Sequence, residues 1–156
     1  MINKIPNIKV PIIRNGVTET LSIQEQFQNK KIIMFGIPGA FTPTCSEEHF
    51  PGYIRLYDKI IKKGIDEIYC LSVNDKYVMQ SWLVSYSENH KIYGIADGNG
   101  EITNYFKLVS DKSNNFMGNR CQRFAMIISN NIIKEVKVEL PGELKVSTAD
   151  NILLRI

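Results

Sequence analysis

The chain has 156 residues, of which 44% are hydrophobic and 22% charged, and its formal net charge is +3. This length suits one domain with a sizeable core and is short for two, so we expect residues 1–156 to form a single domain. The charges are spread without a basic arm or stripe, which argues against a nucleic-acid partner, and no apolar run approaches the ~18 residues of a membrane span.

The first strong element is a short apolar run over residues 31–38 that Gly36 and Pro38 bring to an end. A run of this kind is typical of a buried parallel strand. The loop that follows is dense in turn formers and delivers Cys45 to the start of a helix. The sequence therefore predicts a strand, a loop, a cysteine and a helix in direct succession.

Two helix-start signals coincide at this cysteine. Thr42 and Pro43 form a cap and a first helical residue, and Thr44 with Glu47 forms a capping box. Either signal leaves Cys45 in the first turn, where unpaired N–H groups and the helix dipole stabilise a thiolate. A cysteine that only packs in the core is the alternative, but packing requires neither the Pro-Gly loop nor the doubled cap. The pattern therefore favours a reactive thiol.

Past the cysteine, we expect the helix to continue to about Lys63, with a kink at Pro51 and an end at Gly64. Apolar residues at helical spacing predict its buried face. These residues are Ile54, Tyr57 and Ile61.

The next part of the chain continues the alternation of strand and helix. We expect strands at 67–73 and 91–96, a helix between them that Asn74 or Asp75 caps, and a turn at 97–100. The apolar residues of this helix are Val78, Met79, Trp82, Leu83 and Tyr86.

Two β-rich runs, 123–129 and 132–139, flank the pair Asn130-Asn131, which suits a tight hairpin. Residues 147–156 close the chain as a short helix with a Ser-x-x-Asp start. Strand-helix-strand units followed by an antiparallel hairpin and a final helix predict an α/β domain with a central mixed β-sheet flanked by helices.

The loop sequence Pro38-Gly-Ala-Phe-Thr42-Pro-Thr-Cys45 resembles the active-site signature Pro-x-x-x-Thr-x-x-Cys of the peroxiredoxins. With His49 following, it is similar to the type II subfamily that includes peroxiredoxin-five. Several further segments match in order over about 120 residues, which makes the likeness specific. They are Cys70 to Asp75, Trp82, Ala96 to Gly98, Arg120 to Ala125 and Ser147 to Ile152. The resemblance implies a thioredoxin-like fold, which the predicted order of elements matches.

Reduction of a hydroperoxide needs a thiolate, a group that aligns the peroxide and a positive charge near the sulfur and the leaving oxygen. Cys45 is the expected nucleophile and would become a sulfenic acid. The resemblance implies that Thr42 meets the sulfur or the peroxide, although a helix-cap role stays open. It also implies that Arg123 is the fixed cation, a residue that would otherwise be interpreted as a solvated edge charge.

Other residues of the signature are expected to shape the site. Pro38 and Gly39 would form the loop and keep water from the sulfur. The backbone N–H groups of Thr44 and Cys45 would face the anion. Arg120 is a weaker second cation.

His49 lies one helical turn after Cys45. We favour a packed or capping histidine over a cysteine-histidine hydrolase pair, because no third orienting residue is evident. Neither Cys-x-x-Cys nor His-x-x-x-His spacing occurs, so we expect no metal and no cofactor.

Resolution of the sulfenic acid depends on the remaining cysteines. Peroxiredoxin-five-like proteins carry a resolving cysteine near the C-terminus, where this chain has Val146, whereas plant-like type II members carry one 25 residues after the first, and 70 − 45 = 25 for Cys70. In mid-strand, Cys70 would lie roughly 10 Å below the sheet edge, beyond the ~7 Å between Cα atoms that a disulfide allows, so a buried core cysteine is favoured. Cys121 would share a strand face with Arg123 and approach the site if that strand extends far enough.

We therefore predict a one-cysteine, thiol-dependent peroxidase that reduces hydrogen peroxide and alkyl hydroperoxides. An external thiol would recycle Cys45, with glutathione and glutaredoxin favoured over thioredoxin. One alternative is a redox relay or peroxide sensor that oxidises a partner protein, and another is a binding module with an unreactive thiol.

The resemblance also suggests a homodimer formed through the active-site face, although Phe41 and Phe116 in these loops are equally interpretable as pocket walls. The polar N-terminus, broken by Pro6, is not a targeting peptide, and three cysteines give no disulfide framework. We therefore expect a cytoplasmic location, or an organelle if a targeting peptide has been removed.

Overall fold

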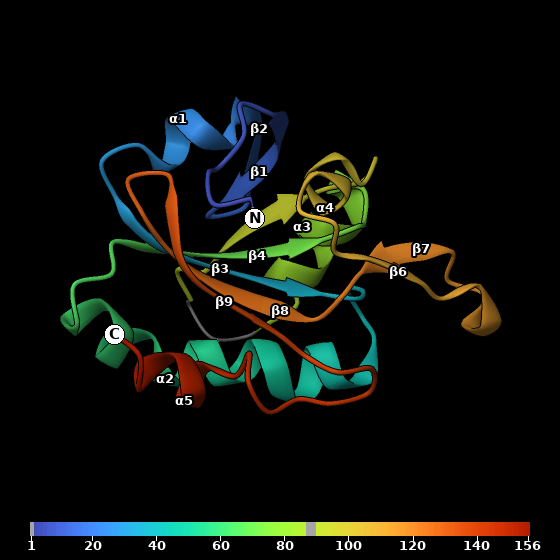
Figure 1. The fold of residues 1–156 in the computed structure, drawn as a ribbon. Coiled ribbons are helices and arrows are strands. Elements are labelled where there is room, and N and C mark those ends of the chain that lie inside the picture. Colours follow the sequence, from blue (N-terminus) through green and yellow to red (C-terminus); the bar gives the residue numbers. More distant parts are fainter. Residues whose placement is uncertain (1, 87–89) are drawn as a thin grey trace.

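The computed structural model describes residues 2–86 and 90–156. Over these residues a mixed sheet of seven strands forms the centre of the molecule (Figure 1). Its strands are β1 (Lys9–Arg14), β2 (Val17–Ser22), β3 (Lys31–Ile37), β4 (Glu67–Ser72), β5 (Tyr93–Ala96), β8 (Phe124–Ser129) and β9 (Ile132–Val138). They lie in the order β2-β1-β5-β4-β3-β8-β9, with β3, β4 and β5 parallel and the outer strands antiparallel.

The helices cover both faces of this sheet. In Figure 1, α2 and α5 run along one face, and α1 and α4 lie over the other. Their bounds are α1 (Ile23–Phe27), α2 (Phe50–Lys62), α3 (Lys76–Val84), α4 (Glu101–Tyr105) and α5 (Ala149–Leu153). The short strands β6 (Val109–Asp111) and β7 (Asn119–Cys121) form a separate hairpin that projects from the sheet edge. The predicted α/β fold with a mixed sheet flanked by helices is confirmed.

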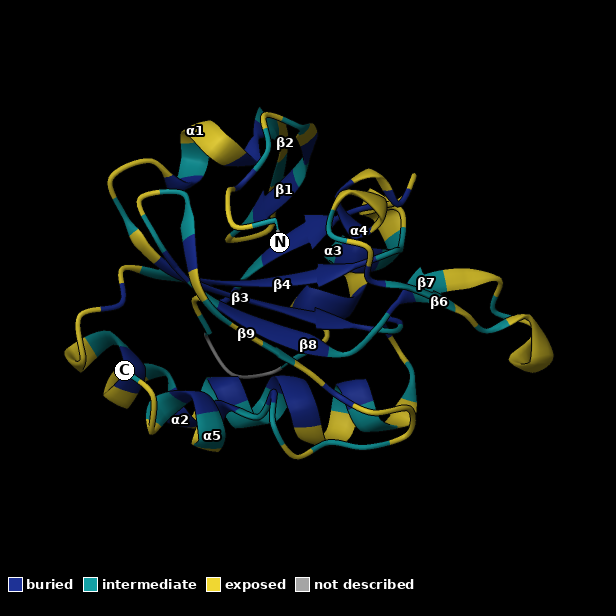
Figure 2. Ribbon diagram, viewed as in Figure 1, coloured by how far each residue is buried: buried dark blue, intermediate teal, exposed yellow. Residues whose placement is uncertain are grey.

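Side chains of the central strands alternate between two buried clusters, as the pleat of a strand requires. Ile33 and Phe35 of β3 pack with α2, α3 and α5, whereas Ile32 and Met34 pack with α1 and α4. Figure 2 shows the buried strands between helices whose outer surfaces are exposed. Because both faces are covered, β3 is apolar at successive positions, and Cys70 of β4 points toward the α2 side.

Two local signals, a helix cap and a tight hairpin, predict the structure well. Asp75 caps α3, and its carboxylate accepts a hydrogen bond from the N–H of Val78 at 2.9 Å. Asn130 and Asn131 have φ values of 45° and 64° and connect β8 to β9 as expected. These features depend only on neighbouring residues, and both predictions are confirmed.

The buried face of α2 differs from the prediction by one residue, which is about 100° around a helix. Its fully buried residues are Phe50, Tyr53, Leu56 and Ile60, while the predicted residues Ile54, Tyr57 and Ile61 are partly buried at its side. Both stripes are apolar, so spacing alone does not distinguish them. The predicted residues still pack against the edge of the same buried cluster.

The start of the last helix was also predicted incorrectly. Thr148, rather than Ser147, caps α5, because its hydroxyl accepts the N–H of Asn151 at 3.1 Å. Ser147 is buried and makes hydrogen bonds elsewhere. The prediction also lacked the hairpin β1–β2, α1, α4 and the hairpin β6–β7.

Gly36 of β3 provides a test of the packing between strands. It lies opposite Phe124 of β8, and a Cβ at this glycine would overlap the ring. We expect Gly36→Ala to lower the free energy of unfolding by about 2–3 kcal/mol, as overpacking does. Urea denaturation measures the change.

Gly52→Ala is the matched control, because its Cβ would lie 3.9 Å from its nearest neighbours, Arg55 of α2 and Ala149 of α5. This change should be neutral or should stabilise the protein by up to about 1 kcal/mol. Equal destabilisation by the two alanines would contradict the packing argument.

Candidate active site

The helix that carries Cys45 begins at Pro43, and its second turn is a π-helical turn over Cys45–His49. The carbonyl of Thr42 accepts the N–H of Ser46 at 3.0 Å, so Thr42 and Pro43 are the operative start signal. The capping box is absent, because Thr44 already has helical φ and ψ and its side chain makes no capping bond. The Cys45 side chain lies in this first part of the helix and the residue is 1% exposed.

The π-helical turn replaces the kink that Pro51 was expected to cause. The N–H of Phe50 donates to the carbonyl of Cys45, five residues earlier. Pro51 has no N–H to continue an α-helical ladder into this turn, which is a physical reason for the wider turn before it. Helix α2 then continues regularly from Phe50.

The loop before the cysteine is held from one side by the hairpin β6–β7. Arg120 donates from Nε to the carbonyl of Met117 at 2.9 Å and from Nη1 to that of Pro38 at 3.4 Å. A Cβ on Gly39 would lie 3.0 Å from Nη1 of Arg120 and 3.1 Å from Cγ2 of Thr42, so glycine fits this close approach. Arg120 thus contacts the loop backbone, and its described hydrogen bonds do not include the sulfur.

The hydroxyl of Thr42 donates to the carbonyl of Gly39 at 2.6 Å. Its proton is therefore used within the loop, while the oxygen lone pairs are open to accept a hydrogen bond. The sequence placed this hydroxyl toward the sulfur or a peroxide. In the structure it also fixes the shape of the loop.

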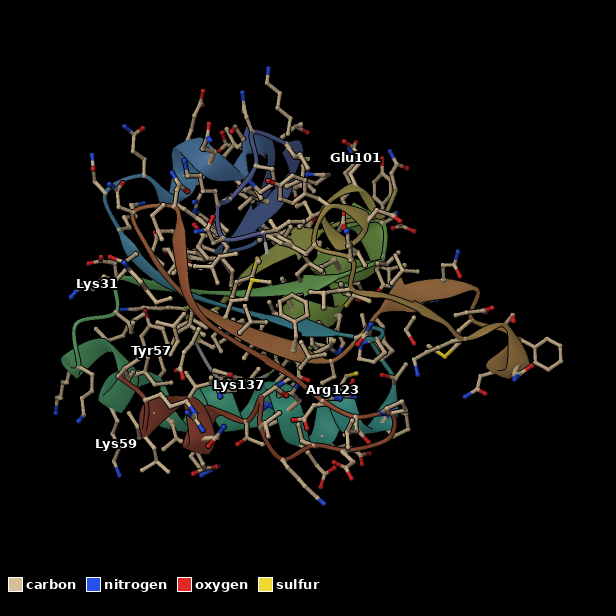
Figure 3. The ribbon with its side chains drawn as sticks, viewed as in Figure 1. Lys31, Tyr57, Lys59, Glu101, Arg123 and Lys137 are labelled. Atoms are coloured by element: carbon tan, nitrogen blue, oxygen red, sulfur yellow. The ribbon has the colours of Figure 1, made fainter. Side chains whose placement is uncertain are left out.

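The guanidinium of Arg123 places a positive charge beside the sulfur of Cys45. Its Nη2 donates to Sγ of Cys45 at 3.2 Å, and its Nη1 donates to Nδ1 of His49 at 3.0 Å. Figure 3 shows Arg123 between the sheet and the layer formed by α2. A guanidinium remains charged at any accessible pH and offers several donors in one plane, so it can hold both contacts at once.

His49 is buried, and it packs and makes hydrogen bonds rather than pairing with the cysteine as a base. Its Nε2 donates to the carbonyl of Ser147 at 3.0 Å, which leaves Nδ1 free to accept from Arg123. Burial lowers the pKa of His49 to about 4, aided by the charge of Arg123 and opposed by the Ser147 hydrogen bond and the charge of Glu139. The ring is therefore neutral at physiological pH.

The sequence did not reveal this link between His49 and Arg123. The four-residue spacing from Cys45 was the available signal, because it places both side chains on one side of the helix. Nothing local indicated the arginine, which lies 74 residues away.

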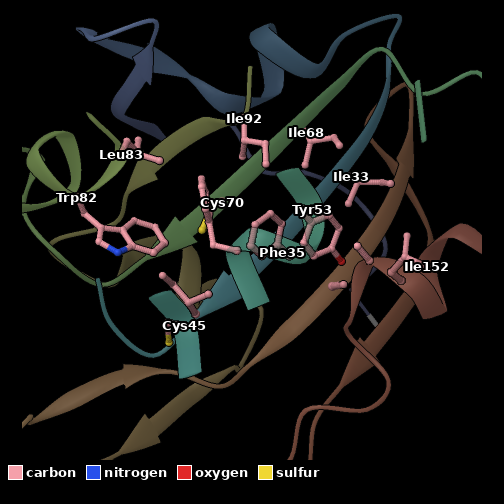
Figure 4. Packing of buried hydrophobic residues seen from close by; sticks show 14 of the residues in the cluster. Ile33, Phe35, Cys45, Tyr53, Ile68, Cys70, Trp82, Leu83, Ile92 and Ile152 are labelled. Atoms are coloured by element: carbon pink, nitrogen blue, oxygen red, sulfur yellow. The ribbon is translucent and has the colours of Figure 1, made fainter. Parts of the chain in front are cut away.

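Helix α3 and the segment directly after it support the turn from the other side. Trp82 donates from Nε1 to the hydroxyl of Ser46 at 2.9 Å, and the hydroxyl of Tyr86 donates to the carbonyl of Ser46 at 2.8 Å. Both rings pack on Phe50, with centroids 4.7 Å and 4.6 Å away. Figure 4 shows Trp82 beside Cys45, so an aromatic group clamps the residue that follows the cysteine.

The other two cysteines are buried, and none of the three forms a disulfide within the described residues. Cys70 lies in the cluster that contains Cys45 (Figure 4), and burial raises its pKa well above the usual value. Cys121 belongs to the opposite cluster, and its thiol donates to the carbonyl of Ile37 at 3.0 Å. Burial raises the pKa of Cys121 as well, so both thiols remain protonated.

The expectation that Cys121 and Arg123 share a strand face is wrong. Strand β7 ends at Cys121 and β8 begins at Phe124, so Arg123 lies in the break between two different sheets. The break turns the chain and places the thiol and the guanidinium in different surroundings.

A cavity of about 330 Å³ opens beside the guanidinium. Pro38, Thr44 and Arg123 are among the residues that line it, and the segment 139–143 forms another wall. In the described part of the chain, no group of three His, Cys, Asp or Glu residues is arranged to hold a metal, and no helix is long and apolar enough to cross a membrane.

A cysteine at a helix start under a guanidinium, on a mixed sheet covered by helices, defines the thioredoxin-like class of thiol proteins. The family model for Redoxin matches residues 3–153. The chain therefore belongs to the redoxin family and, within it, to the peroxiredoxins, which are thiol-dependent peroxidases.

Individual relatives support this assignment. Peroxiredoxin-2D from Arabidopsis thaliana is 44% identical over 139 residues, which cover 89% of this chain and 86% of the relative. The structure of reduced Prx3 in complex with hydrogen peroxide from Vibrio vulnificus has a TM-score of 0.92 at 39% identity and covers 99% of both chains. A Plasmodium falciparum antioxidant protein, described as a 1-Cys peroxiredoxin, has a TM-score of 0.88 at 38% identity, over 97% of this chain and 96% of its own.

The buried histidine should make stability depend on pH. His49 has a pKa of about 4 when folded and 6.5 as a reference, so the unfolded chain binds its proton first. Its contribution to stability is complete above pH 6.5 and is lost as pH falls toward 4, by about 3 kcal/mol in total. Urea unfolding at several pH values measures this loss.

His49→Gln is the control, because the amide can donate to Ser147 and accept from Arg123 without titrating. The wild-type protein should lose about 3 kcal/mol more than this variant between pH 7 and pH 4. Parallel stability curves for the two proteins would show that His49 is not the titrating group.

Proposed function

We propose that Cys45 is the residue that the hydroperoxide oxidises. The observation that carries this proposal is the 3.2 Å contact between Nη2 of Arg123 and the sulfur, within the first turns of a helix. An electron pair of the Cys45 thiolate forms a bond to one peroxide oxygen, which keeps its hydrogen, while the O–O bond breaks. The other oxygen takes a proton from solvent and leaves as water or alcohol. Cys45 becomes a sulfenic acid.

The surrounding residues have separate roles in this reaction. Arg123 stabilises the thiolate and the negative charge that develops on the leaving oxygen. Thr42, whose proton is donated to Gly39, accepts a hydrogen bond from the peroxide O–H and so aligns it. Pro38 and Thr44, which line the cavity, shape the space beside the guanidinium.

Hydrogen peroxide and alkyl hydroperoxides are the proposed substrates. A cavity of about 330 Å³ next to Arg123 leaves room for an alkyl group as well as the two peroxide oxygens. The similar structure from Vibrio vulnificus, described as a complex with hydrogen peroxide, supports the smaller substrate.

The proposed reductant is an external thiol, with glutathione and glutaredoxin ahead of thioredoxin. Cys70 and Cys121 are buried thiols with raised pKa values, and Val146 occupies the place of a C-terminal cysteine. The Plasmodium falciparum relative, described as a 1-Cys peroxiredoxin, supports a mechanism with one reactive cysteine.

A homodimer through the active-site face is the proposed assembly. Phe41 in the loop before Cys45 is 56% exposed, and Phe116 at the tip of the hairpin β6–β7 is 99% exposed. Exposed aromatic residues are typical of contact surfaces. Sedimentation velocity tests this assembly, and a species of monomer mass at micromolar concentration would exclude it.

A reducing compartment is the proposed location, and the cytoplasm is the simplest one. The three cysteines are unpaired over the described residues. Relatives from Arabidopsis thaliana and Oryza sativa are named as chloroplastic, so a reducing organelle fits the same chemistry.

Substitution of the thiols separates their roles. Cys45→Ser should abolish peroxide turnover, because a hydroxyl lacks the nucleophilic thiolate. Cys70→Ser should keep at least part of the activity, because this thiol is buried and its raised pKa keeps it protonated. The assay follows peroxide decay with excess dithiothreitol, and retained turnover in Cys45→Ser would refute the assignment.

The fate of the oxidised cysteine tests the external reductant. One equivalent of peroxide should add one oxygen to the intact mass, located on Cys45 by peptide mapping. A mass lower by two hydrogens, with a disulfide between Cys45 and Cys70 or Cys121, would contradict the one-cysteine mechanism. Glutathione, glutaredoxin and thioredoxin supplied in turn should then identify the recycling thiol, and rapid oxidation without recycling by any of them would favour a redox relay or sensor.

A further inference from the structure

We propose that Glu139 is a positioning residue of the peroxidase site, acting through the backbone of Ser147 on the ring of His49. This inference rests on the proposed roles of Cys45 and Arg123. It concerns the residues that decide which nitrogen of the His49 ring carries the proton.

Glu139 follows β9 and is 6% exposed. Its Oε2 accepts the backbone N–H groups of Lys145, Val146 and Ser147, at 2.8, 2.9 and 2.8 Å, and the Ser147 hydroxyl at 2.7 Å. One carboxylate oxygen therefore organises the whole turn at 145–147. Charge-assisted bonds of this kind are stronger than neutral ones, so the turn is held firmly.

The same residue is also tied to the strand break that carries the cation. The backbone N–H of Glu139 donates to the carbonyl of Arg123 at 2.9 Å. The side chain of Glu139 thus fixes the turn, and its main chain fixes the base of the arginine. Glu139 therefore holds both hydrogen-bond partners of His49, which are Ser147 and Arg123.

The turn presents the carbonyl of Ser147 to the interior. This oxygen accepts Nε2–H of His49 at 3.0 Å and the hydroxyl of Tyr53 at 2.7 Å. The Ser147 hydroxyl lies 3.3 Å from the same ring nitrogen and donates to Glu139. A carbonyl only accepts, so the proton of the neutral ring must be on Nε2.

The tautomer matters because of what faces the other nitrogen. With the proton on Nε2, Nδ1 carries a lone pair and accepts from Nη1 of Arg123 at 3.0 Å. With the proton on Nδ1, two N–H donors would face each other and the guanidinium would be displaced. The Nη2 contact to the sulfur of Cys45 at 3.2 Å would be displaced with it.

The carboxylate of Glu139 is charged although the residue is buried. Burial opposes its ionisation, but the hydrogen bonds from Ser147, Lys145 and Val146 outweigh burial and lower its pKa. The charge therefore strengthens the hydrogen bonds that hold the turn at 145–147.

Three substitutions at Glu139 test the inference in the full-length reduced protein. Glu139→Ala removes the acceptor, Glu139→Asp keeps the charge but withdraws it by one methylene, and Glu139→Gln keeps an acceptor at the same reach. Glu135→Ala is the matched control, because Glu135 lies in β9, which Glu139 follows, and its carboxylate pairs with Lys137 and Arg155 at the surface.

Two measurements are compared across these variants. The imidazole ¹⁵N shifts of His49 report its tautomer, and stopped-flow oxidation by hydrogen peroxide gives the second-order rate constant of Cys45. We expect Ala and Asp to mix the tautomers and to lower the rate constant about tenfold or more, a usual cost of a misplaced supporting group. Gln should restore the wild-type tautomer and stay within about threefold of the wild-type rate, while Glu135→Ala should change neither.

Several outcomes would overturn the inference. They are a wild-type tautomer and rate in both Ala and Asp, a slow enzyme with an unchanged tautomer, or a Gln variant as impaired as Ala. If the alanine variant does not fold, Asp and Gln decide between reach and charge by themselves. The tautomer is read without catalysis, so an active Cys45→Ser would overturn the proposed function while leaving this result intact.

Discussion

The contact between the guanidinium of Arg123 and the sulfur of Cys45 is the interaction on which this site depends. The two residues are 78 positions apart, and they meet because β3 and β8 are neighbouring antiparallel strands. The cysteine follows the end of β3 and the arginine precedes the start of β8, so both lie at one edge of the sheet. The sulfur is almost fully buried, where little water screens the charge beside it.

Several weak constraints hold that edge in place. The loop before Cys45 is fixed by Arg120 and by the hydroxyl of Thr42, and the turn after it is fixed by Trp82 through Ser46. The sulfur can be buried and still lie next to open space, because the cavity opens beside the guanidinium rather than over the cysteine itself. The thiol is thus held by hydrogen bonds on both sides, and a cavity opens next to it beside the guanidinium.

Burial also separates the ionisable groups of the core by charge state. His49 stays neutral because its pKa is about 4, while the carboxylate of Glu139 is charged because its hydrogen bonds outweigh desolvation. Cys70 and Cys121 stay protonated because burial raises their pKa values. The positive charge of Arg123 is therefore shared between one thiol and one neutral ring.

The sequence by itself determined what neighbouring residues control: the unit of strand, loop and helix at Cys45, the Asp75 cap and the Asn130-Asn131 hairpin. The motif also identified the family, because its residues are consecutive. Only the tertiary structure decided which apolar stripe of α2 faces the sheet, that the break after Cys121 separates it from Arg123, and that His49 joins that arginine to Ser147. The physical reason is distance along the chain: these hydrogen bonds link residues 74 and 98 positions apart, and no local propensity records them.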